Sequence, residues 1–233
     1  MTHVQHLVHR QLLKWESEAK ARAEAEETAV PPQAHPFVTV SREAGSWGSQ
    51  AAALVAKDLG WQCLDREIVD YVAKDAQVEE RVVASLDERA RGYIEAWVAS
   101  FVDGKHIESA DYLRHLARVL RALVQHEPAV IVGRGAHLIL STIRDRCLAV
   151  RVMAPLKLRV ARLAQDQGVS EAVALERIRS ADKARAQFFH AVLGRSVDDP
   201  MQFDLVINTE RLSIRQTADV ILSAVRARGL VTK

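Results

Sequence analysis

The feature that most constrains this chain is a change in hydrophobic periodicity at a proline-rich segment, residues 28–36 (TAVPPQAHP). Before it, residues 4–28 place apolar side chains three and four positions apart, which predicts an amphipathic helix. After it, short apolar runs typical of buried strands alternate with longer stretches of helical pattern. The predicted strands are 37–40 (FVTV), 61–64 (WQCL), 129–132 (AVIV), 147–153 and 203–207 (FDLVI). This alternation favours a parallel sheet covered by helices on both faces.

The helical stretches occupy most of the chain between these strands. They cover 51–59, 66–75, 79–102, 109–126, a stretch after Pro155, 170–190 and 213–228, with a break at Asp103-Gly104. The apolar stripe of the N-terminal helix must be buried somewhere. It either docks on the rest of the chain or joins two copies into a homodimer.

Composition excludes several classes of protein. The 233 residues carry a net charge of +2, which does not favour bulk nucleic-acid binding, and 48% are hydrophobic, enough for a core. Cys63 and Cys147 lie far apart, so neither a disulfide scaffold nor a cysteine-rich zinc site is expected. Neither a membrane helix nor a signal peptide can be recognised. We therefore expect a cytoplasmic protein with neither a membrane nor a nucleic-acid partner.

Polar residues and glycines follow the predicted strands at their carboxyl ends, where ligands bind in parallel sheets. They are Ser41-Arg42-Glu43, Asp65-Arg66, Gly133-Arg134-Gly135 and Asn208-Thr209. Because these ends meet at one edge of the sheet, we expect the chemistry of the protein to lie there.

The segment 41–50 (SREAGSWGSQ) joins the first strand to a helix, which is the setting of a phosphate-binding loop. Gly45 and Gly48 allow the backbone to approach a phosphate, and Ser49 stands where a hydroxyl would meet a metal ion. The usual lysine before that hydroxyl is absent, because Gly48 takes its place. The segment is therefore either a phosphate loop with Arg42 as its cation or an ordinary turn with helix-capping serines.

From this loop onward the chain resembles the cytidylate kinase-like family of P-loop proteins. The resemblance starts with SREAGSWGSQAAALVAKDLGW (41–61) and LDREIVDYVA (64–73). It continues in order through ADYLRHLARVLRAL (110–123), AVIVGRGAHLIL (129–140), RVMAPLKLRVARL (151–163), RIRSADKARAQFF (177–189) and DPMQFDLVINTERLSI (199–214). It covers about 37–228, and it departs from the family at Trp47, where a glycine is usual.

The resemblance implies a P-loop NTPase-type three-layer α/β/α fold with a five-stranded parallel sheet. The kinase-like domain would span 37–233, with a helical acceptor-side insertion over 66–128 and a lid-like segment over 170–195. Residues 1–30 would be an N-terminal helical extension, joined to the domain by a linker over 31–36. The resemblance also implies ATP and Mg²⁺ as cofactors, and phosphoryl transfer to a small phosphate-bearing acceptor.

The candidate site residues follow from the loop, the strand ends and the resemblance. The catalytic candidates are Arg42, Asp65, Arg134, Arg179, Asp182 and Arg185. The nucleotide-binding candidates are Ser41, Gly45, Ser46, Gly48, Ser49 and Asn208, with Ser49 also on Mg²⁺. The acceptor-binding candidates are Arg66, Arg134 and Arg177.

Arginine suits these roles because its planar fork donates two parallel hydrogen bonds to a phosphate. Each assignment has a structural alternative. The arginines of the lid-like segment equally fit a solvated helix face, and Asp65 equally fits a helix N-cap. Asp182 is expected to position Arg185 or a neighbouring arginine rather than to perform acid–base chemistry. Glu43 is able to pair with Arg42 and to hold it for a phosphate.

Together these observations predict an ATP-dependent kinase for a nucleoside monophosphate or a related acceptor. Two alternatives stay open. Without the loop lysine the protein could be a nucleotide-binding protein with little turnover. It could also be an oligomerising interaction protein that works through residues 1–30.

Overall fold

A computed structural model describes residues 2–24, 34–86, 90–92, 94–95, 98–99 and 110–231. The chain forms two compact units. One consists of Met1–Pro36 and Leu64–Ala129, and the other of Phe37–Cys63 and Val130–Lys233. In the described ranges, no helix is both long enough and apolar enough to cross a membrane.

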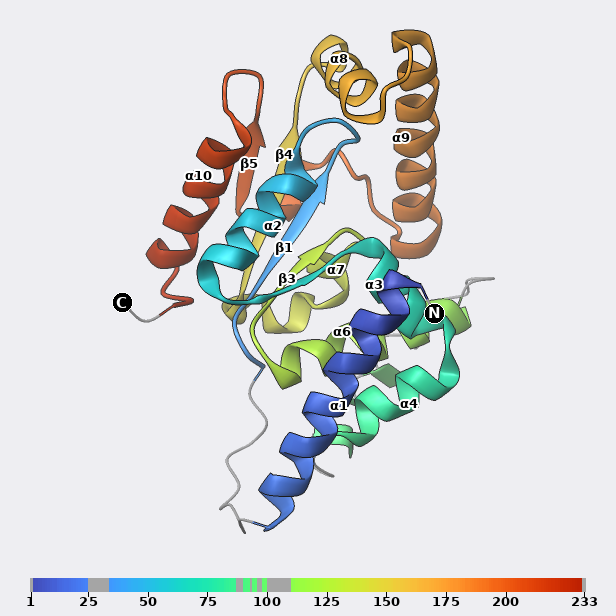
Figure 1. The fold of residues 1–233 in the computed structure, drawn as a ribbon, viewed down its shortest axis with the longest axis vertical. Helices are drawn as coiled ribbons and strands as arrows, with labels where there is room; N and C mark the ends of the chain where they lie inside the picture. Colours follow the sequence, from blue (N-terminus) through green and yellow to red (C-terminus); the bar gives the residue numbers. More distant parts are fainter. Residues whose placement is uncertain are drawn as a thin grey trace. The chain divides into compact units, whose positions relative to one another are not determined.

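A five-stranded sheet forms the centre of the fold, with strand order β2-β3-β1-β4-β5 (Figure 1). The strands are β1 (Phe37–Arg42), β2 (Gln62–Leu64), β3 (Ala129–Val132), β4 (Cys147–Met153) and β5 (Leu205–Asn208). Strand β4 pairs in parallel with both β1 and β5, and Ser41 lies opposite Arg151. The predicted three-layer α/β fold with a five-stranded parallel sheet is therefore confirmed.

The predicted strands match the structure to within two residues, and β5 begins two residues later than predicted. Pro200–Gln202 form a short 3₁₀ helix capped by the Asp199 side chain, which accepts a hydrogen bond from the Met201 amide. Phe203 ends that turn, and its ring lies 4.6 Å from the ring of His137. The first apolar residue of FDLVI therefore packs under the turn, and pairing with β4 starts at Leu205.

Helices α2 (Gly48–Leu59) and α10 (Ile214–Ala227) pack on one face of the sheet. Alternate residues of β1 and β4 face them, because side chains on a strand point to opposite faces in turn. This core contains Val38, Val40, Val150, Val152, Ala52, Val55, Ile221, Leu222 and Val225. The intervening strand residues, Ser41 and Arg151 among them, therefore point to the other face.

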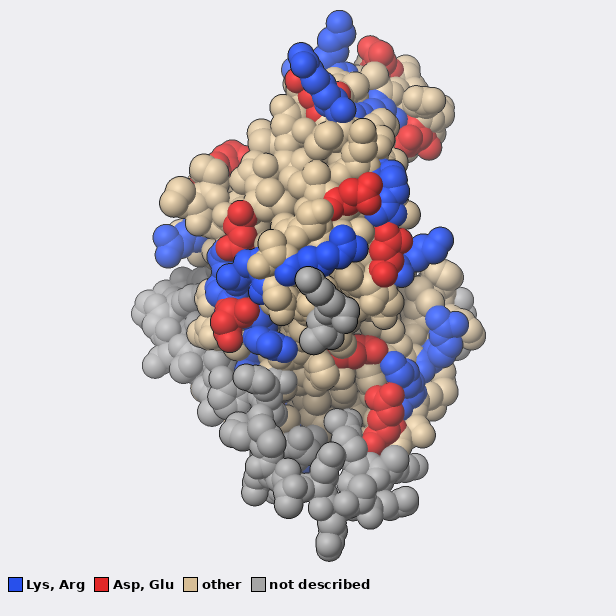
Figure 2. All heavy atoms as spheres, turned by 90° about the vertical axis from the view of Figure 1, so that its left-hand side faces the viewer, with Lys and Arg blue, Asp and Glu red and all other residues tan. Residues whose placement is uncertain are grey.

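The remaining helices of this unit connect β3, β4 and β5. They are α7 (Ala136–Ile139), α8 (Leu156–Gln167) and α9 (Glu171–Leu193), and a 3₁₀ segment spans Ser141–Arg146. Acidic and basic side chains are interspersed on the face shown in Figure 2, and neither sign forms one continuous patch over the described residues in view.

The other unit is helical, and the N-terminal helix is part of it. Its described helices include α1 (His3–Glu24), α3 (Arg66–Lys74), α4 (Ala76–Ala84) and α6 (Ala110–His126). Asp75 separates α3 from α4, because its side chain caps α4 by accepting hydrogen bonds from the amides of Gln77 and Val78. The predicted end of the first helix and the predicted break at Asp103-Gly104 lie outside the described residues.

The apolar stripe of α1 is buried within this unit, through Val8, Leu12 and Trp15. The Trp15 ring stacks on His126 with centroids 4.1 Å apart, and its Nε1 donates to Glu127 at 3.1 Å. The stripe therefore docks on its own chain, one of the two outcomes expected from the sequence.

Leu12→Ala should destabilise the protein by about 2–4 kcal/mol, because Leu12 is only 1% exposed and its removal leaves a cavity. Leu13 is the matched control, since it is the next residue and is 52% exposed. Chemical denaturation should show a change within about 0.5 kcal/mol for Leu13→Ala. Equal losses from the two variants would contradict the packing of α1 on its own unit.

Candidate functional site

The loop between β1 and α2 is a tight turn that packs closely against the rest of its unit. Gly45 has φ +77°, and a Cβ there would lie 2.5 Å from the carbonyl oxygen of Arg159, so only glycine fits. Ser46 is fully buried, and its hydroxyl lies 2.8 Å from the Glu43 carbonyl and 3.2 Å from the Val152 carbonyl. These contacts fix the loop, so that the amides ahead of α2 are held at the N-terminus of a twelve-residue helix.

Gly48 opens helix α2 in a space that admits no side chain. A Cβ at this position would lie 2.6 Å from the Cβ of Arg42 and 2.9 Å from the Cβ of Val152. A lysine at position 48 would therefore not fit this loop, because the helix starts directly against β1 and β4.

Arg42 brings a cation to the loop from the end of β1. Its Nε donates to the Ser49 hydroxyl at 3.0 Å. Its Nη1 lies 2.9 Å from where a Cβ of Gly133 would be, so the side chain crosses towards the end of β3. The sequence-predicted residues Arg42, Gly48, Ser49 and Gly133 are therefore brought together.

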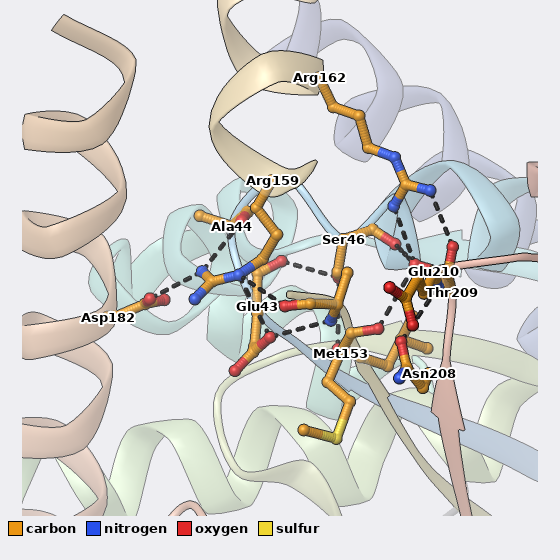
Figure 3. A network of polar contacts seen from close by, with 12 residues as sticks. Glu43, Ala44, Ser46, Met153, Arg159, Arg162, Asp182, Asn208, Thr209 and Glu210 are labelled. Carbon is orange, nitrogen blue, oxygen red and sulfur yellow. Dashed lines mark hydrogen bonds and ion pairs between the residues drawn. The ribbon is translucent and has the colours of Figure 1, made fainter. Parts of the chain in front are cut away.

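Trp47 adopts a left-handed backbone, with φ +64°, which an L side chain rarely takes. The guanidinium of Arg162 lies 3.5 Å from the centroid of its ring, a cation–π contact. Arg162 also donates to the hydroxyl and the carbonyl of Thr209, at 3.0 and 2.8 Å. Thr209 in turn donates to the Ser46 carbonyl at 3.0 Å, so Arg162 ties the loop to the end of β5 (Figure 3).

A second network ties the loop to helix α9 (Figure 3). Arg159 lies 3.3 Å from Glu43 and 2.8 Å from Asp182, and Asp182 also pairs with Arg185 at 2.7 Å. Burial alone would raise the pKa of Asp182, but the hydrogen bonds from the two arginines outweigh it and lower the pKa. The Asp182–Arg185 contact exists, and the role of Asp182 in positioning Arg185 towards a ligand stays a prediction. The expected Glu43–Arg42 pair is wrong, because the Glu43 carboxylate faces Arg159 and accepts from the Ala154 amide instead.

Arg151 is a buried cation beside the start of the loop. It is 6% exposed, and its Nη1 donates to the Ser41 hydroxyl at 2.9 Å. Burial lowers its pKa, and the Arg185 guanidinium lowers it further. Arg151 is therefore a buried arginine in direct contact with Ser41, a predicted nucleotide-binding residue.

The other predicted residues of this unit lie in three settings. Arg134 has φ +54°, and its guanidinium lies 5.6 Å from the ring of Phe188 on α9. Arg177 and Arg179 are exposed on α9, as expected for a solvated helix face. The side-chain oxygen of Asn208 accepts a hydrogen bond from the Glu210 amide and so shapes the turn after β5.

Asp65 and Arg66 belong to the helical unit. The Asp65 carboxylate accepts hydrogen bonds from the amides of Glu67 and Ile68, at 2.9 and 3.0 Å, and so caps α3. Arg66 is 3.7 Å from Asp70. The N-cap foreseen as the alternative for Asp65 is present, and the roles of both residues towards a ligand stay predictions.

The sequence does not predict three arginines that the structure places around the loop: Arg151, Arg159 and Arg162. Arg151 carries a usable signal, because it is the one charged residue in the apolar strand sequence CLAVRVM. Arg159 and Arg162 stand three apart in α8, and both are under 10% exposed. In the sequence they resemble any pair of arginines on a helix face.

His137, on α7, is a buried histidine that the sequence does not assign to the site. It is 2% exposed, and burial lowers its pKa to about 4, with the Arg144 guanidinium adding to the effect. Its ring lies against the aromatic rings of Phe189 and Phe203. The folded protein therefore holds this imidazole neutral.

This histidine should make stability depend on pH. Its folded pKa lies below the unfolded value of about 6.5, so the unfolded chain binds its proton first as the pH falls. The contribution is complete above pH 6.5 and is lost between about 6.5 and 4, by up to about 3 kcal/mol. Denaturation curves across that range should show a shallower loss for His137→Phe. An unchanged slope would contradict the neutral, buried state.

The sequence predicts that Ser49 of the loop meets a metal ion together with phosphate oxygens. Over the parts of the chain that the structure covers, no group of three His, Cys, Asp or Glu side chains could cage one. One hydroxyl together with phosphate oxygens is a donor set that fits Mg²⁺, because this ion keeps water and substrate phosphates among its ligands. Ser49, at the start of α2, offers the hydroxyl.

Comparisons with known proteins agree with the fold and the loop. The model of the cytidylate kinase-like family matches residues 37–211. A cytidylate kinase from Staphylothermus marinus is 33% identical over 92 residues, 40% of this chain and 51% of that protein. A uronate isomerase from Corynebacterium glutamicum is 32% identical over 93 residues, 40% of this chain but 18% of that protein. The chain thus spans about half or less of the length of these two relatives.

Among solved structures, an uncharacterized protein from Eubacterium ventriosum has a TM-score of 0.66 at 22% identity. The match covers 83% of this chain and 99% of that protein, and it shows the fold alone. The family model extends over more than half of the chain and includes the loop, the arginine network and β5. The chain therefore belongs to the cytidylate kinase-like family.

Proposed function

We propose that this protein is a cytoplasmic, ATP-dependent kinase that phosphorylates a nucleoside monophosphate of the cytidylate type. The observation that carries the proposal is the loop at the end of β1. Gly45 and Gly48 leave room only for backbone, and Arg42, bonded to Ser49, places a cation where lysine is absent. Family membership supports the same reaction class.

The loop fits the phosphates of ATP. Its amides precede helix α2, whose N-terminus favours an anion, and Arg42 would neutralise charge from the side of β1. Mg²⁺, when bound with the nucleotide, would neutralise further charge on the phosphates, with Ser49 as its protein ligand. The protein needs to hold two substrates in line and to stabilise developing negative charge, which fixed arginines do well.

Each side of the site would have its own arginines. Arg42 would serve the nucleotide, with Arg185 on α9 facing the transferred group. Arg134 would bind the acceptor phosphate, because it follows β3 on a left-handed backbone between two glycines. Asp182 is a positioning residue in this scheme, since it holds Arg159 and Arg185.

A nucleotide-binding protein with little turnover is the second candidate. Trp47 favours it, because a bulky indole held under Arg162 stands at the start of α2, where the family has glycine. The interaction-protein alternative loses its apolar surface, since Val8, Leu12 and Trp15 are buried within one chain. A homodimer through α1 would have to use its other face and stays a prediction, which light scattering tests.

The proposed function is tested by nucleotide binding and turnover together. ATP with Mg²⁺ should raise the melting temperature, and CMP should be phosphorylated. Arg134→Ala should leave ATP affinity nearly unchanged but weaken CMP binding or turnover about 10- to 100-fold, the loss of a charge-assisted contact. Arg134→Lys should recover only part of this, because a point charge lacks the fork.

The outcomes separate the two candidates. Binding of ATP without transfer to any monophosphate would favour the nucleotide-binding protein. Collapse of ATP binding in Arg134→Ala, with the acceptor unaffected, would place Arg134 on the donor side. The absence of ATP binding would overturn the proposal.

A further inference from the structure

We propose that Arg151 binds a substrate phosphate, and that the Asp198 carboxylate stands in for that phosphate until it arrives. The inference deepens the proposed function and rests on it for the identity of the substrate. The site lies on the face of the sheet opposite α2 and α10, where β4 runs beside the start of the loop.

Arg151 is placed like a ligand-binding residue. It is in register with Ser41, the residue that precedes Arg42, and donates to the Ser41 hydroxyl at 2.9 Å. Burying a guanidinium in a sheet is costly unless charge and hydrogen bonds compensate it. A side chain that is 6% exposed on a central strand therefore needs an anion close by.

The carboxylates around Arg151 compensate it incompletely. The nearest oxygen of Glu43 is 4.0 Å away, whereas the same side chain lies 3.3 Å from Arg159 and accepts from the Ala154 amide. Asp198 is 3.5 Å away, at the outer limit of a hydrogen bond. The nearby Arg185 adds repulsion, which contributes to the lowered pKa of Arg151. Among the described residues, the Arg151 guanidinium therefore has only long contacts, to Asp198 and Glu43, at its Nη2.

Asp198 can leave without disturbing the fold. Its side chain is 79% exposed, and it lies in the segment between α9 and the 3₁₀ turn at Pro200–Gln202. An ion pair this exposed contributes little to stability. A phosphate that displaced it would meet the Arg151 guanidinium, and a phosphate suits the planar fork better than one distant carboxylate oxygen.

Two phosphates have this chemistry: that of a nucleoside monophosphate and the terminal phosphate of ATP. We therefore compare CMP with cytidine, and ATP with ADP, by titration calorimetry at constant ionic strength, with inorganic phosphate as the minimal probe. Asp198→Asn removes the competing carboxylate. Asp145→Asn is the matched control, because Asp145 is exposed and precedes β4, at the opposite end of that strand.

Asp198→Asn should strengthen binding of the phosphate-bearing ligand about two- to fivefold, the equivalent of one exposed ion pair. Asp145→Asn should change it by less. Arg151→Gln should weaken the same ligand about 10-fold or more. The decisive result is the double variant: Asp198→Asn should give no gain once Arg151 is glutamine, because the carboxylate competes only at that guanidinium.

Each result bears on the proposal. An affinity gain for CMP but not cytidine places the acceptor phosphate at Arg151, and a gain for ATP but not ADP places the donor's terminal phosphate there. If Asp198→Asn matches Asp145→Asn for every probe, the inference is wrong, and it is equally wrong if the gain persists in the double variant. If phosphate binding depends on Arg151 but the protein has no kinase activity, the phosphate site at Arg151 is supported and the proposed function is wrong. If Arg151→Gln does not fold, the comparison of Asp198→Asn with Asp145→Asn decides the proposal, because both variants leave Arg151 intact.

Discussion

Gly48→Lys should abolish nucleotide binding, although it supplies the lysine that phosphate loops usually carry. A Cβ at position 48 would lie 2.6 Å from the Cβ of Arg42 and 2.9 Å from that of Val152, both closer than real Cβ atoms approach. Both neighbours belong to strands of the central sheet, so neither can swing away as the tip of a flexible side chain would. The start of α2 must shift, and the loop amides shift with it.

The smaller substitution separates size from charge. Gly48→Ala should cost about 1–3 kcal/mol of stability, the usual cost of overpacking, and should weaken ATP binding. Gly92→Ala is the control, because Gly92 is a helical glycine and no atom of the described residues lies within 4 Å of the added Cβ. That variant should be neutral or slightly stabilising. Binding of ATP by Gly48→Lys at wild-type strength would show that the loop adapts and that its lysine was lost for another reason.

The strands were predictable because burial on both faces leaves a direct trace in the sequence. The runs at 129–132 and 147–153 match β3 and β4 residue for residue. FDLVI misleads at its first residues, because Phe203 is apolar for a different reason: it packs on His137 beneath a turn. An apolar run predicts which residues are buried, but it does not predict at which residue pairing with a neighbouring strand begins.

The candidate site was predictable only where the backbone demanded a residue. Gly45 and Gly48 stand out in the sequence, and each turns out to be required by a close backbone approach or a buried helix start. Arg159 and Arg162 do not stand out, because their partners, Asp182 and Thr209, are 23 and 47 positions away. Glu43 was assigned to its chain neighbour Arg42, yet the fold brings Arg159 to it. Ion pairs between distant segments need tertiary structure before they can be named.

Arg159→Met should be the most destabilising single change in the arginine network, at about 3 kcal/mol or more. The guanidinium is buried and holds Glu43 and Asp182, and it also donates to the carbonyls of Ala44 and Ala154. Methionine fills much of the volume but leaves the Glu43 carboxylate without its nearest cation, and breaking one side of a buried pair is costly. Chemical denaturation measures the loss, and weaker ATP binding should accompany it, because Ala44 and Glu43 belong to the loop.

A double variant tests whether the unpaired Glu43 carboxylate causes the loss of stability in Arg159→Met. If the unpaired carboxylate is the main cost, Arg159→Met/Glu43→Gln should recover part of the loss, because the glutamine can be buried without a charge. Arg215→Met is the surface control: Arg215 pairs with Asp58 and Asp219, but its side chain is 47% exposed. Its loss should be much smaller than that of Arg159→Met, because exposed ion pairs contribute little to stability. Equal losses of stability from Arg159→Met and Arg215→Met would mean that solvent screens the ion pairs of the buried network. Glu43 would then be free to move to Arg151 when a phosphate displaces Asp198. A large loss of stability from Arg159→Met alone would mean that Arg159 holds Glu43 in place. Of the two carboxylates near Arg151, Asp198 would then be the one that a phosphate displaces.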